Sequence, residues 1–368
     1  MKRLLAAGLL AFSLQSLPAA QAAEAQTGNT PPAPAGPAAG MQPTATFKPA
    51  EPPAVDLSGP AGLAPPVDVV KPAEPPPAAP AADAASAPAP GGPPADLAYG
   101  AFQRGYYLTA MNWAIKRVEA QKDPVAMTLI AQIYDNGLGV PEDKIKAAEW
   151  YAEAARRGDR NAIFSYGMAK LTGRGVPKDE SGGMLLLNRA AALKVPQASY
   201  NLGIIALRPS NGAPDYATAF QRFTEAAASN SGDALYSLGI LTQEGKGVPA
   251  DARKAADYFL QAANAGNLDA MVEYGIALFN GQGVQQDEEL AADWFERAAE
   301  RGSPIARNRL ARLYAAGQGL APNAILACMW HILAKAGGLE DRQLDQFMAR
   351  QTPEVQQAAI LGARVHGL

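Results

Sequence analysis

The sequence predicts an all-α protein, a right-handed α-solenoid of stacked helix-turn-helix repeats preceded by a proline-rich arm. The first observation is an internal period: from Asp123 to Gly338 the chain divides into six consecutive units of 36 residues without an insertion or a deletion. The second is that alanine or glycine recurs at fixed positions of every unit. The third is a glycine pair that separates two helix-length stretches in five of the units.

Residues 1–22 are predicted to be a cleaved signal peptide. Lys2 and Arg3 precede an apolar run from Leu4 to Leu17, and Ala20-Gln21-Ala22 offers the small residues that signal peptidases read. The alternative is an uncleaved anchor, but the apolar run is shorter than the roughly 20 residues needed to span a bilayer. Since no cysteine follows this run, we expect no lipoprotein. The expected location is periplasmic or secreted, without membrane insertion after cleavage.

Residues 23–95 are predicted to be a disordered Pro/Ala-rich linker. Most of the 31 prolines lie between Pro31 and Pro94, among alanine, glycine and scattered acids. Such a segment has too few large apolar residues to offset its chain entropy by burial.

Charge and cysteine content narrow the expected partners. The net charge of −3 provides no basic field for nucleic acid or for an anionic lipid surface, so we expect neither partner. The single cysteine, Cys328, excludes a disulfide within the chain. The oligomeric state is not predicted by any of these features.

Fixed positions within the units carry the packing pattern. The first position of each unit is Asp123, Asp159, Val195, Ser231, Asn267 or Ser303. Position 4 is always alanine, position 9 is alanine or glycine, and position 32 is alanine again, which favours two closely packed helices. Positions 28 and 29 hold the large side chains, and we expect core packing for them. They are Trp150-Tyr151, Leu186-Leu187, Arg222-Phe223, Tyr258-Phe259, Trp294-Phe295 and Trp330-His331.

Each unit predicts a first helix from about position 3 to position 14, a turn, and a second helix. Glycine pairs such as Gly137 and Gly139 end the first helix, because glycine accepts the left-handed conformation there. An acid such as Asp143, Asp179 or Asp251 opens the second helix, where its charge suits the helix dipole.

The pattern A…LG…GxGV…KAxxWY…AAxxG resembles the Sel-1-like repeat (SLR) family, which is related to the tetratricopeptide repeats (TPR). Unit five resembles it closely, with Tyr274-Gly275, Gly281-Gln282-Gly283-Val284, Trp294-Phe295 and Ala298-Ala299. The resemblance covers residues 123–338 and implies an interaction scaffold. Some cysteine-rich secreted members of the family are credited with penicillin binding, so a penicillin-binding or β-lactamase-like activity is the enzymatic alternative.

Two units depart from the pattern, and two flanking segments are expected to cap the array. Unit three has Arg208 to Pro214 instead of the glycine turn, which predicts a shorter first helix. Unit two has Ser181-Gly182-Gly183 at the start of its second helix, which predicts a weak start and a softer place around residues 171–215. Residues 96–122 read as a TPR-like hairpin broken near Gly105, with Tyr99, Phe102, Tyr106, Tyr107, Met111 and Trp113 on its apolar side. Residues 339–368 read as closing helices, from Leu339 to Arg350 and from Pro353 to Val365, with Thr352 as N-cap.

No residues are predicted to be catalytic or to bind a cofactor or metal. The chain has no Ser-x-x-Lys or Gly-x-Ser-x-Gly motif and lacks the paired cysteines of the penicillin-binding members. Cys328 and His331 lie one helical turn apart, but they stand at packing positions, and His366 is the only other histidine. We therefore expect a protein that is not an enzyme.

The expected function is to bind another envelope protein in a concave groove formed by the first helices. If positions 4, 8 and 12 face the neighbouring helix, positions 3, 7, 10 and 14 face the groove. Position 10 would then form an apolar floor from Met168, Ile204, Ile240 and Ile276. Position 7 would make polar contacts through Asn201, Glu273 and Arg309. Two alternatives remain: position 10 packs between adjacent first helices, or the array is a structural spacer without a groove.

Overall fold

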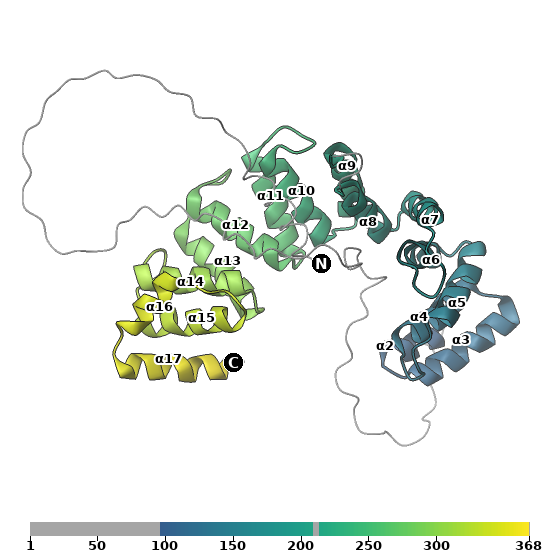
Figure 1. Cartoon of the computed structure of the whole chain (residues 1–368), viewed down its shortest axis with the longest axis horizontal. Coiled ribbons are helices and arrows are strands. Elements are labelled where there is room, and N and C mark those ends of the chain that lie inside the picture. Colours follow the sequence, from purple (N-terminus) through teal and green to yellow (C-terminus); the bar gives the residue numbers. More distant parts are fainter. Residues whose placement is uncertain (1–95, 209–212, 368) are drawn as a thin grey trace, which may run out of the picture. The chain divides into compact units, whose positions relative to one another are not determined.

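The computed structural model describes residues 96–208 and 213–367, which form sixteen α-helices labelled α2 to α17 in Figure 1 and no strand. The predicted all-α repeat fold is confirmed. The predicted signal peptide, residues 1–22, and the predicted linker, residues 23–95, lie outside the described residues.

The helices belong to two compact units, which we describe separately. The N-terminal unit holds α2 (Leu97–Gln103), α3 (Tyr107–Gln121), α4 (Pro124–Asn136), α5 (Lys144–Arg156), α6 (Arg160–Thr172), α7 (Glu180–Ala192), α8 (Pro196–Ala206), α9 (Tyr216–Ala227) and α10 (Gly232–Glu244) as far as Leu238, with residues 246–248. The C-terminal unit holds the rest of α10 and α11 (Ala252–Asn264), α12 (Leu268–Asn280), α13 (Glu288–Glu300), α14 (Pro304–Ala316), α15 (Ala324–Ala336), α16 (Arg342–Ala349) and α17 (Pro353–Val365).

Successive helices pair within the predicted repeats, as α4 with α5 in repeat 1, α8 with α9 in repeat 3 and α14 with α15 in repeat 6. Position 9 is small because it lies against the side chain at position 29. A Cβ added to Gly275 would lie 2.7 Å from Cε1 of Phe295, and one added to Gly203 would lie 2.6 Å from Cε1 of Phe223. The rings are fully buried, as expected for a core built on close helix approach.

Each second helix begins at an N-cap at position 21, where the side chain accepts a hydrogen bond from the first turn. The main-chain N–H of the same residue donates to the carbonyl at position 12 of the first helix, and we call this bond the hairpin staple. It recurs in all six repeats, at 2.8 to 3.1 Å, from Asp143 to Tyr134, Asp179 to Lys170, Asp215 to Ala206, Asp251 to Thr242, Asp287 to Leu278 and Asn323 to Tyr314.

In the five loops that contain a glycine pair, the two glycines are required for different physical reasons. The glycine at position 15 ends the first helix in the left-handed region, as at Gly281 with φ +66°. The glycine at position 17 also has positive φ, and it lies against the preceding repeat. A Cβ on Gly283 would lie 2.1 Å from the carbonyl oxygen of Ala252, so only glycine allows this approach.

The two departing repeats behave differently. In repeat 3 the first helix ends at Ala206, two residues before its counterparts, as predicted. In repeat 2 the second helix has its full length from Glu180, N-capped by Asp179, so the predicted weak start is not seen in its helical extent. Gly183 is instead required by packing, because a Cβ there would lie 2.5 Å from Cγ of Leu171.

The N-terminal hairpin corrects one expectation. Its helices lie on either side of Gly105, but the buried side is formed by small residues, chiefly Ala98, Ala101, Ala110 and Ala114. Phe102 and Met111 are partly buried against the core and Tyr107 is partly buried, whereas Tyr99, Tyr106 and Trp113 are exposed. The close approach of α2 and α3 leaves no room for large rings between them.

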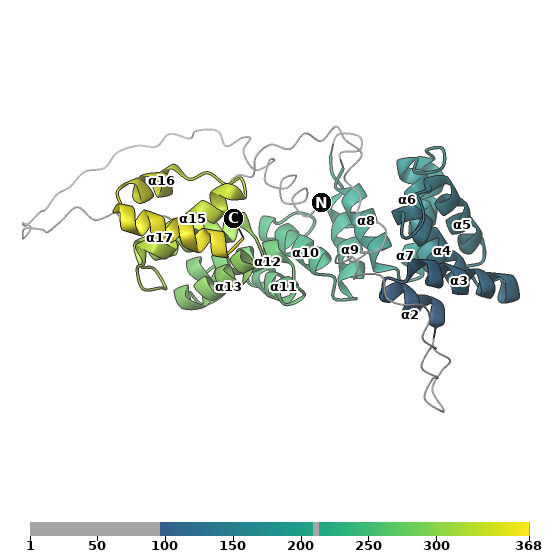
Figure 2. The ribbon, with the colours of Figure 1, turned by 90° about the horizontal axis from the view of Figure 1, so that it is seen from below.

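In the C-terminal unit the closing helices are α16 and α17, and Figure 2 shows α17 lying along α15. The N-cap of α16 is Asp341, which also accepts hydrogen bonds from Arg312 at 2.8 Å and Asn308 at 2.9 Å. Thr352 precedes α17 as predicted but makes no side-chain capping bond. No helix in the described part of the chain is long and apolar enough to cross a membrane.

Candidate functional site

The predicted apolar floor at position 10 is largely closed. Met168, Ile240 and Ile276 are only 5%, 6% and 4% exposed, and Ile204 is partly buried. This burial favours the packing alternative, in which these side chains are enclosed by neighbouring elements. In neither unit do these residues form an open groove floor.

Position 7 is also mostly buried, although it carries polar side chains. Asn201 and Arg309 are buried, with Ser165 and Ser237 at the same position, while Glu273 is partly buried. The amide of Asn201 donates to the carbonyl of Gln197 at 2.8 Å, and burial of its polar atoms is thereby compensated within its own helix. The expectation of polar groove contacts from Asn201 and Arg309 is corrected by this burial.

Glu273 differs from the other side chains at position 7 because burial disfavours the charged form of its carboxyl group. Burial raises its pKa to about 7, with Arg309 opposing the rise and with Asp269 and Glu244 adding to it. Burial also lowers the pKa of Arg309 to about 10, which Arg312 reinforces and Glu273 opposes. The C-terminal unit therefore holds a carboxylate that a further cation would stabilise.

The accessible part of the first-helix face lies at its ends, positions 3 and 14. Sequence reasoning placed these positions on the groove side but did not select them. Val125, Asn136, Asn161, Thr172, Gln197, Arg208 and Ala316 are exposed, and Asp233, Glu244, Asp269, Asn280 and Ile305 are partly buried. Their polar composition suits contact with a partner better than the closed positions 7 and 10 do.

Sequence reasoning missed the contacts between successive repeats, where the loop of one repeat lies on the preceding hairpin. We call this place a junction and name it by the two repeats that form it. Three side chains meet there: positions 13 and 22 of the first repeat and position 16 of the next. In junction 1–2 they are Asp135, Lys144 and Arg174.

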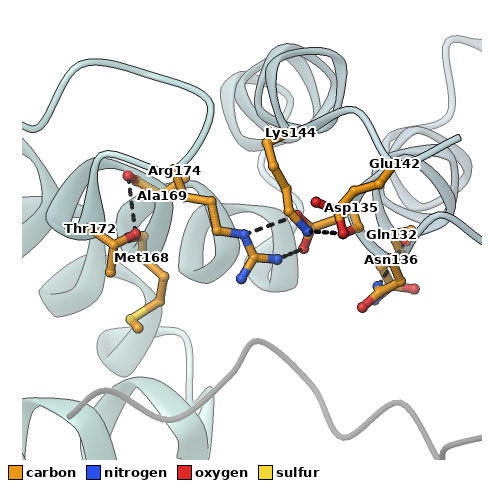
Figure 3. A network of polar contacts seen from close by, with 9 residues as sticks. All are labelled: Gln132, Asp135, Asn136, Glu142, Lys144, Met168, Ala169, Thr172 and Arg174. Atoms are coloured by element: carbon orange, nitrogen blue, oxygen red, sulfur yellow. Dashed lines mark hydrogen bonds and ion pairs between the residues drawn. The ribbon is translucent and has the colours of Figure 1, made fainter. Parts of the chain in front are cut away.

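Figure 3 shows these three side chains pointing toward one another from α4, the start of α5 and the loop after α6. Nε of Arg174 donates to Asp135 at 3.2 Å, a second nitrogen of the guanidinium pairs with the other carboxylate oxygen, and Nζ of Lys144 lies 3.6 Å from the carboxylate. Ala147, Ala148, Tyr151 and Ala169 of the same two repeats are all buried. Burial raises the pKa of Tyr151, and the charge of Asp135 adds to the rise.

Other junctions use different side chains at the same positions. In junction 3–4 the ammonium of Lys246 lies 5.4 Å from the ring centre of Tyr216. In junction 4–5 the three positions are Gln243, Ala252 and Gln282, and they border a cavity of about 230 Å³. The charge network of junction 1–2 is thus replaced by open space in junction 4–5.

Comparison with known proteins agrees with the repeat boundaries. The sequence profile of the Sel1 repeat matches residues 124–159, 161–195, 232–267, 268–303 and 304–339. The chain belongs to the Sel1 repeat family. Sel1 repeat proteins are generally non-catalytic scaffolds for protein–protein interaction.

Solved structures of Sel1 repeat proteins are similar to this chain. The Sel1 repeat protein from Oxalobacter formigenes is 29% identical, with a TM-score of 0.60, over 65% of this chain and 98% of that one. The protective antigen c5321 from uropathogenic Escherichia coli, which displays an SLR fold, is 24% identical with a TM-score of 0.46, over 73% of this chain and 67% of that one. No curated protein matches the sequence.

The Sel1 profile leaves residues 196–231 unmatched, which hold nearly all of the third predicted repeat, residues 195–230, although its helices α8 and α9 pair as in the other repeats. The missing glycine loop explains why the profile passes over it. In repeat 6, Cys328 and His331 are both buried, and Nε2 of His331 lies 2.9 Å from Asp345. Among residues 96–208 and 213–367, no group of three or more His, Cys, Asp or Glu side chains is arranged to hold a metal ion.

Proposed function

We propose that this Sel1 repeat protein is a non-catalytic scaffold of the bacterial cell envelope. Its place in the periplasm is supported by Lys2, Arg3, the apolar run and Ala20-Gln21-Ala22. It binds a helix or an extended segment of another envelope protein along the exposed ends of its first helices. Family membership supports the scaffold role.

The observation that carries the choice of surface is the raised pKa of Glu273. A carboxylate that is partly removed from water gains most when a partner supplies a positive charge. Asp269 and Glu244 lie close enough to influence it, and both are partly exposed on the same unit. The partner segment therefore carries a lysine or an arginine that lies at Asp269 and Glu244 on the first-helix ends, where its charge also stabilises Glu273.

Site-specific photocrosslinking tests this surface in intact cells. A benzophenone amino acid replaces Asp269 on the first-helix face, and a matched control replaces the exposed Glu296 on α13, a second helix. Adducts with envelope proteins are expected at residue 269 and not at residue 296, and Glu273→Gln should reduce their yield. A chain that gives no adduct at residue 269, or equal adducts at both residues, would be the structural spacer instead.

The location is tested separately by fractionation and by the N-terminal residue of the mature chain. The expected product is periplasmic and begins at Ala23. Full-length chain retained in the membrane would contradict the periplasmic proposal and favour the uncleaved anchor.

A further inference from the structure

The cavity in junction 4–5 lies within the C-terminal unit and has an apolar floor. It is lined by Ala255, Ala256 and Phe259 from repeat 4 and by Ala277 from repeat 5. Ala252, Gln243 and Gln282 border its opening, and all three are exposed. None of the lining residues carries a charge, so the cavity is suited to an uncharged, apolar group.

Junction 1–2 has similar residues at the positions that form the cavity floor of junction 4–5. Ala147, Ala148, Tyr151 and Ala169 stand at the positions that Ala255, Ala256, Phe259 and Ala277 hold in junction 4–5. There Asp135, Lys144 and Arg174 form a charge network at the three junction positions. In junction 4–5 the same positions hold Gln243, Ala252 and Gln282, which border the cavity.

Junction 3–4 indicates what kind of group fits this place. Position 22 is Tyr216 there, with Lys246 over its ring. Position 13 of junction 5–6 is also aromatic, Phe279, and is buried. The repeats on either side of the cavity in the sequence thus place an aromatic ring at one of the three junction positions.

We propose that the cavity of junction 4–5 binds an aromatic side chain from the partner protein. An apolar cavity of about 150 Å³ in another protein binds benzene, so a volume of about 230 Å³ accommodates a phenyl ring. The exposed side-chain amides of Gln243 and Gln282 border the opening and can donate to and accept from the peptide groups that flank the ring. The inference rests on the proposed scaffold function, for which it supplies an anchoring residue.

Binding of a single ring can be measured without the partner. The probe is N-acetyl-phenylalanine amide, with N-acetyl-alanine amide as its control, added to the mature protein with ¹³C-labelled alanine methyl groups. The phenylalanine probe is expected to shift the methyl signals of Ala252, Ala255, Ala256 and Ala277 in a saturable way, and the alanine probe to bind at least tenfold more weakly.

Two variants at one repeat position decide whether the cavity is responsible. Ala252→Tyr copies Tyr216 and should fill the space, which abolishes the shifts. Ala324→Tyr makes the same change at position 22 of repeat 6 and should leave probe binding unchanged. Ala252→Lys, which copies Lys144, is a second blocking variant if the tyrosine variant melts at a lower temperature.

Absence of saturable shifts, equal shifts with both probes, or phenylalanine binding that survives both blocking variants would overturn the inference. The scaffold proposal would stand in that case, because photocrosslinking at residue 269 does not depend on the cavity. Conversely, saturable probe binding without any crosslinked partner at residue 269 would support the cavity and contradict the proposed first-helix surface.

Discussion

Junctions 1–2 and 4–5 share a backbone contact and differ in every side chain above the floor. A Cβ on Gly175 would lie 1.9 Å from the carbonyl oxygen of Lys144, and one on Gly283 would lie 2.1 Å from that of Ala252. The first junction adds a charge network to this contact, and the second leaves a cavity. The comparison indicates that main-chain contact fixes the spacing of the repeats, while side chains at the same place are free to serve another purpose.

The largest expected effect comes from the shared glycine. Gly175→Ala and Gly283→Ala should each cost about 2–4 kcal/mol, because a left-handed alanine and a clash with backbone add together. Gly173→Ala and Gly281→Ala are the controls, since their nearest added contacts are side-chain atoms at 3.3 Å. These should cost about 1–2 kcal/mol. Urea denaturation followed by circular dichroism measures the difference, and equal costs in all four variants would contradict a backbone-determined spacing.

Truncation of the side chain at position 13 should reduce stability more in junction 1–2 than in junction 4–5. Asp135→Ala should destabilise the protein by about 1–3 kcal/mol, because Arg174 and Lys144 lose a buried partner. Gln243→Ala at the equivalent position should change stability by less than about 0.5 kcal/mol, as expected for an exposed side chain. Urea denaturation measures the loss of stability in both variants. A similar loss for Asp135→Ala and Gln243→Ala would show that the charge network adds nothing to stability.

The carboxylate at position 7 should make stability depend on pH. In the unfolded chain Glu273 has its ordinary pKa of 4.5, and in the fold its pKa is about 7, so the folded state holds the proton more tightly between these values. Its contribution is therefore complete below about pH 4.5 and is lost as pH rises through 7. Glu273→Gln should remove a decline of about 1–3 kcal/mol over this range.

The measurement is the free energy of unfolding between pH 4.5 and pH 8, with Glu296→Gln as an exposed control on the second helix of the same repeat. The control should follow the wild-type curve. A Glu273→Gln curve that also follows it would contradict the raised pKa, and with it the reason for placing a cationic partner there.

The smallest expected effect is the conversion of one junction into the other. The triple variant Gln243→Asp, Ala252→Lys and Gln282→Arg transfers the charge network to junction 4–5 and should change stability by only about 0–1 kcal/mol, because its charges are partly exposed. It should nevertheless abolish binding of N-acetyl-phenylalanine amide, which methyl shifts would report. Retention of binding would show that the ring does not occupy the junction.

The sequence predicted contacts within a hairpin better than contacts between hairpins. Gly275 and Phe295 recur at positions 9 and 29, and helical periodicity predicts that the small residue and the ring both face the core. The burial of Ile240 at position 10 depends on packing against neighbouring elements, which a single helix period does not encode. Junction 1–2 could have been found from the charges at positions 13, 16 and 22, but only if the loop were known to lie on the preceding repeat.

The hairpin staple has a consequence for how such a protein changes over generations. It joins main-chain atoms of positions 21 and 12, and it persists in repeat 3, whose glycine loop is lost. Any unit of 36 residues therefore carries its own closure, whatever side chains its loop contains. An in-frame duplication or deletion of one unit adds or removes a closed hairpin and leaves the rest intact. The gene can thus lengthen the array one copy at a time, and each copy brings a new junction on which selection can act.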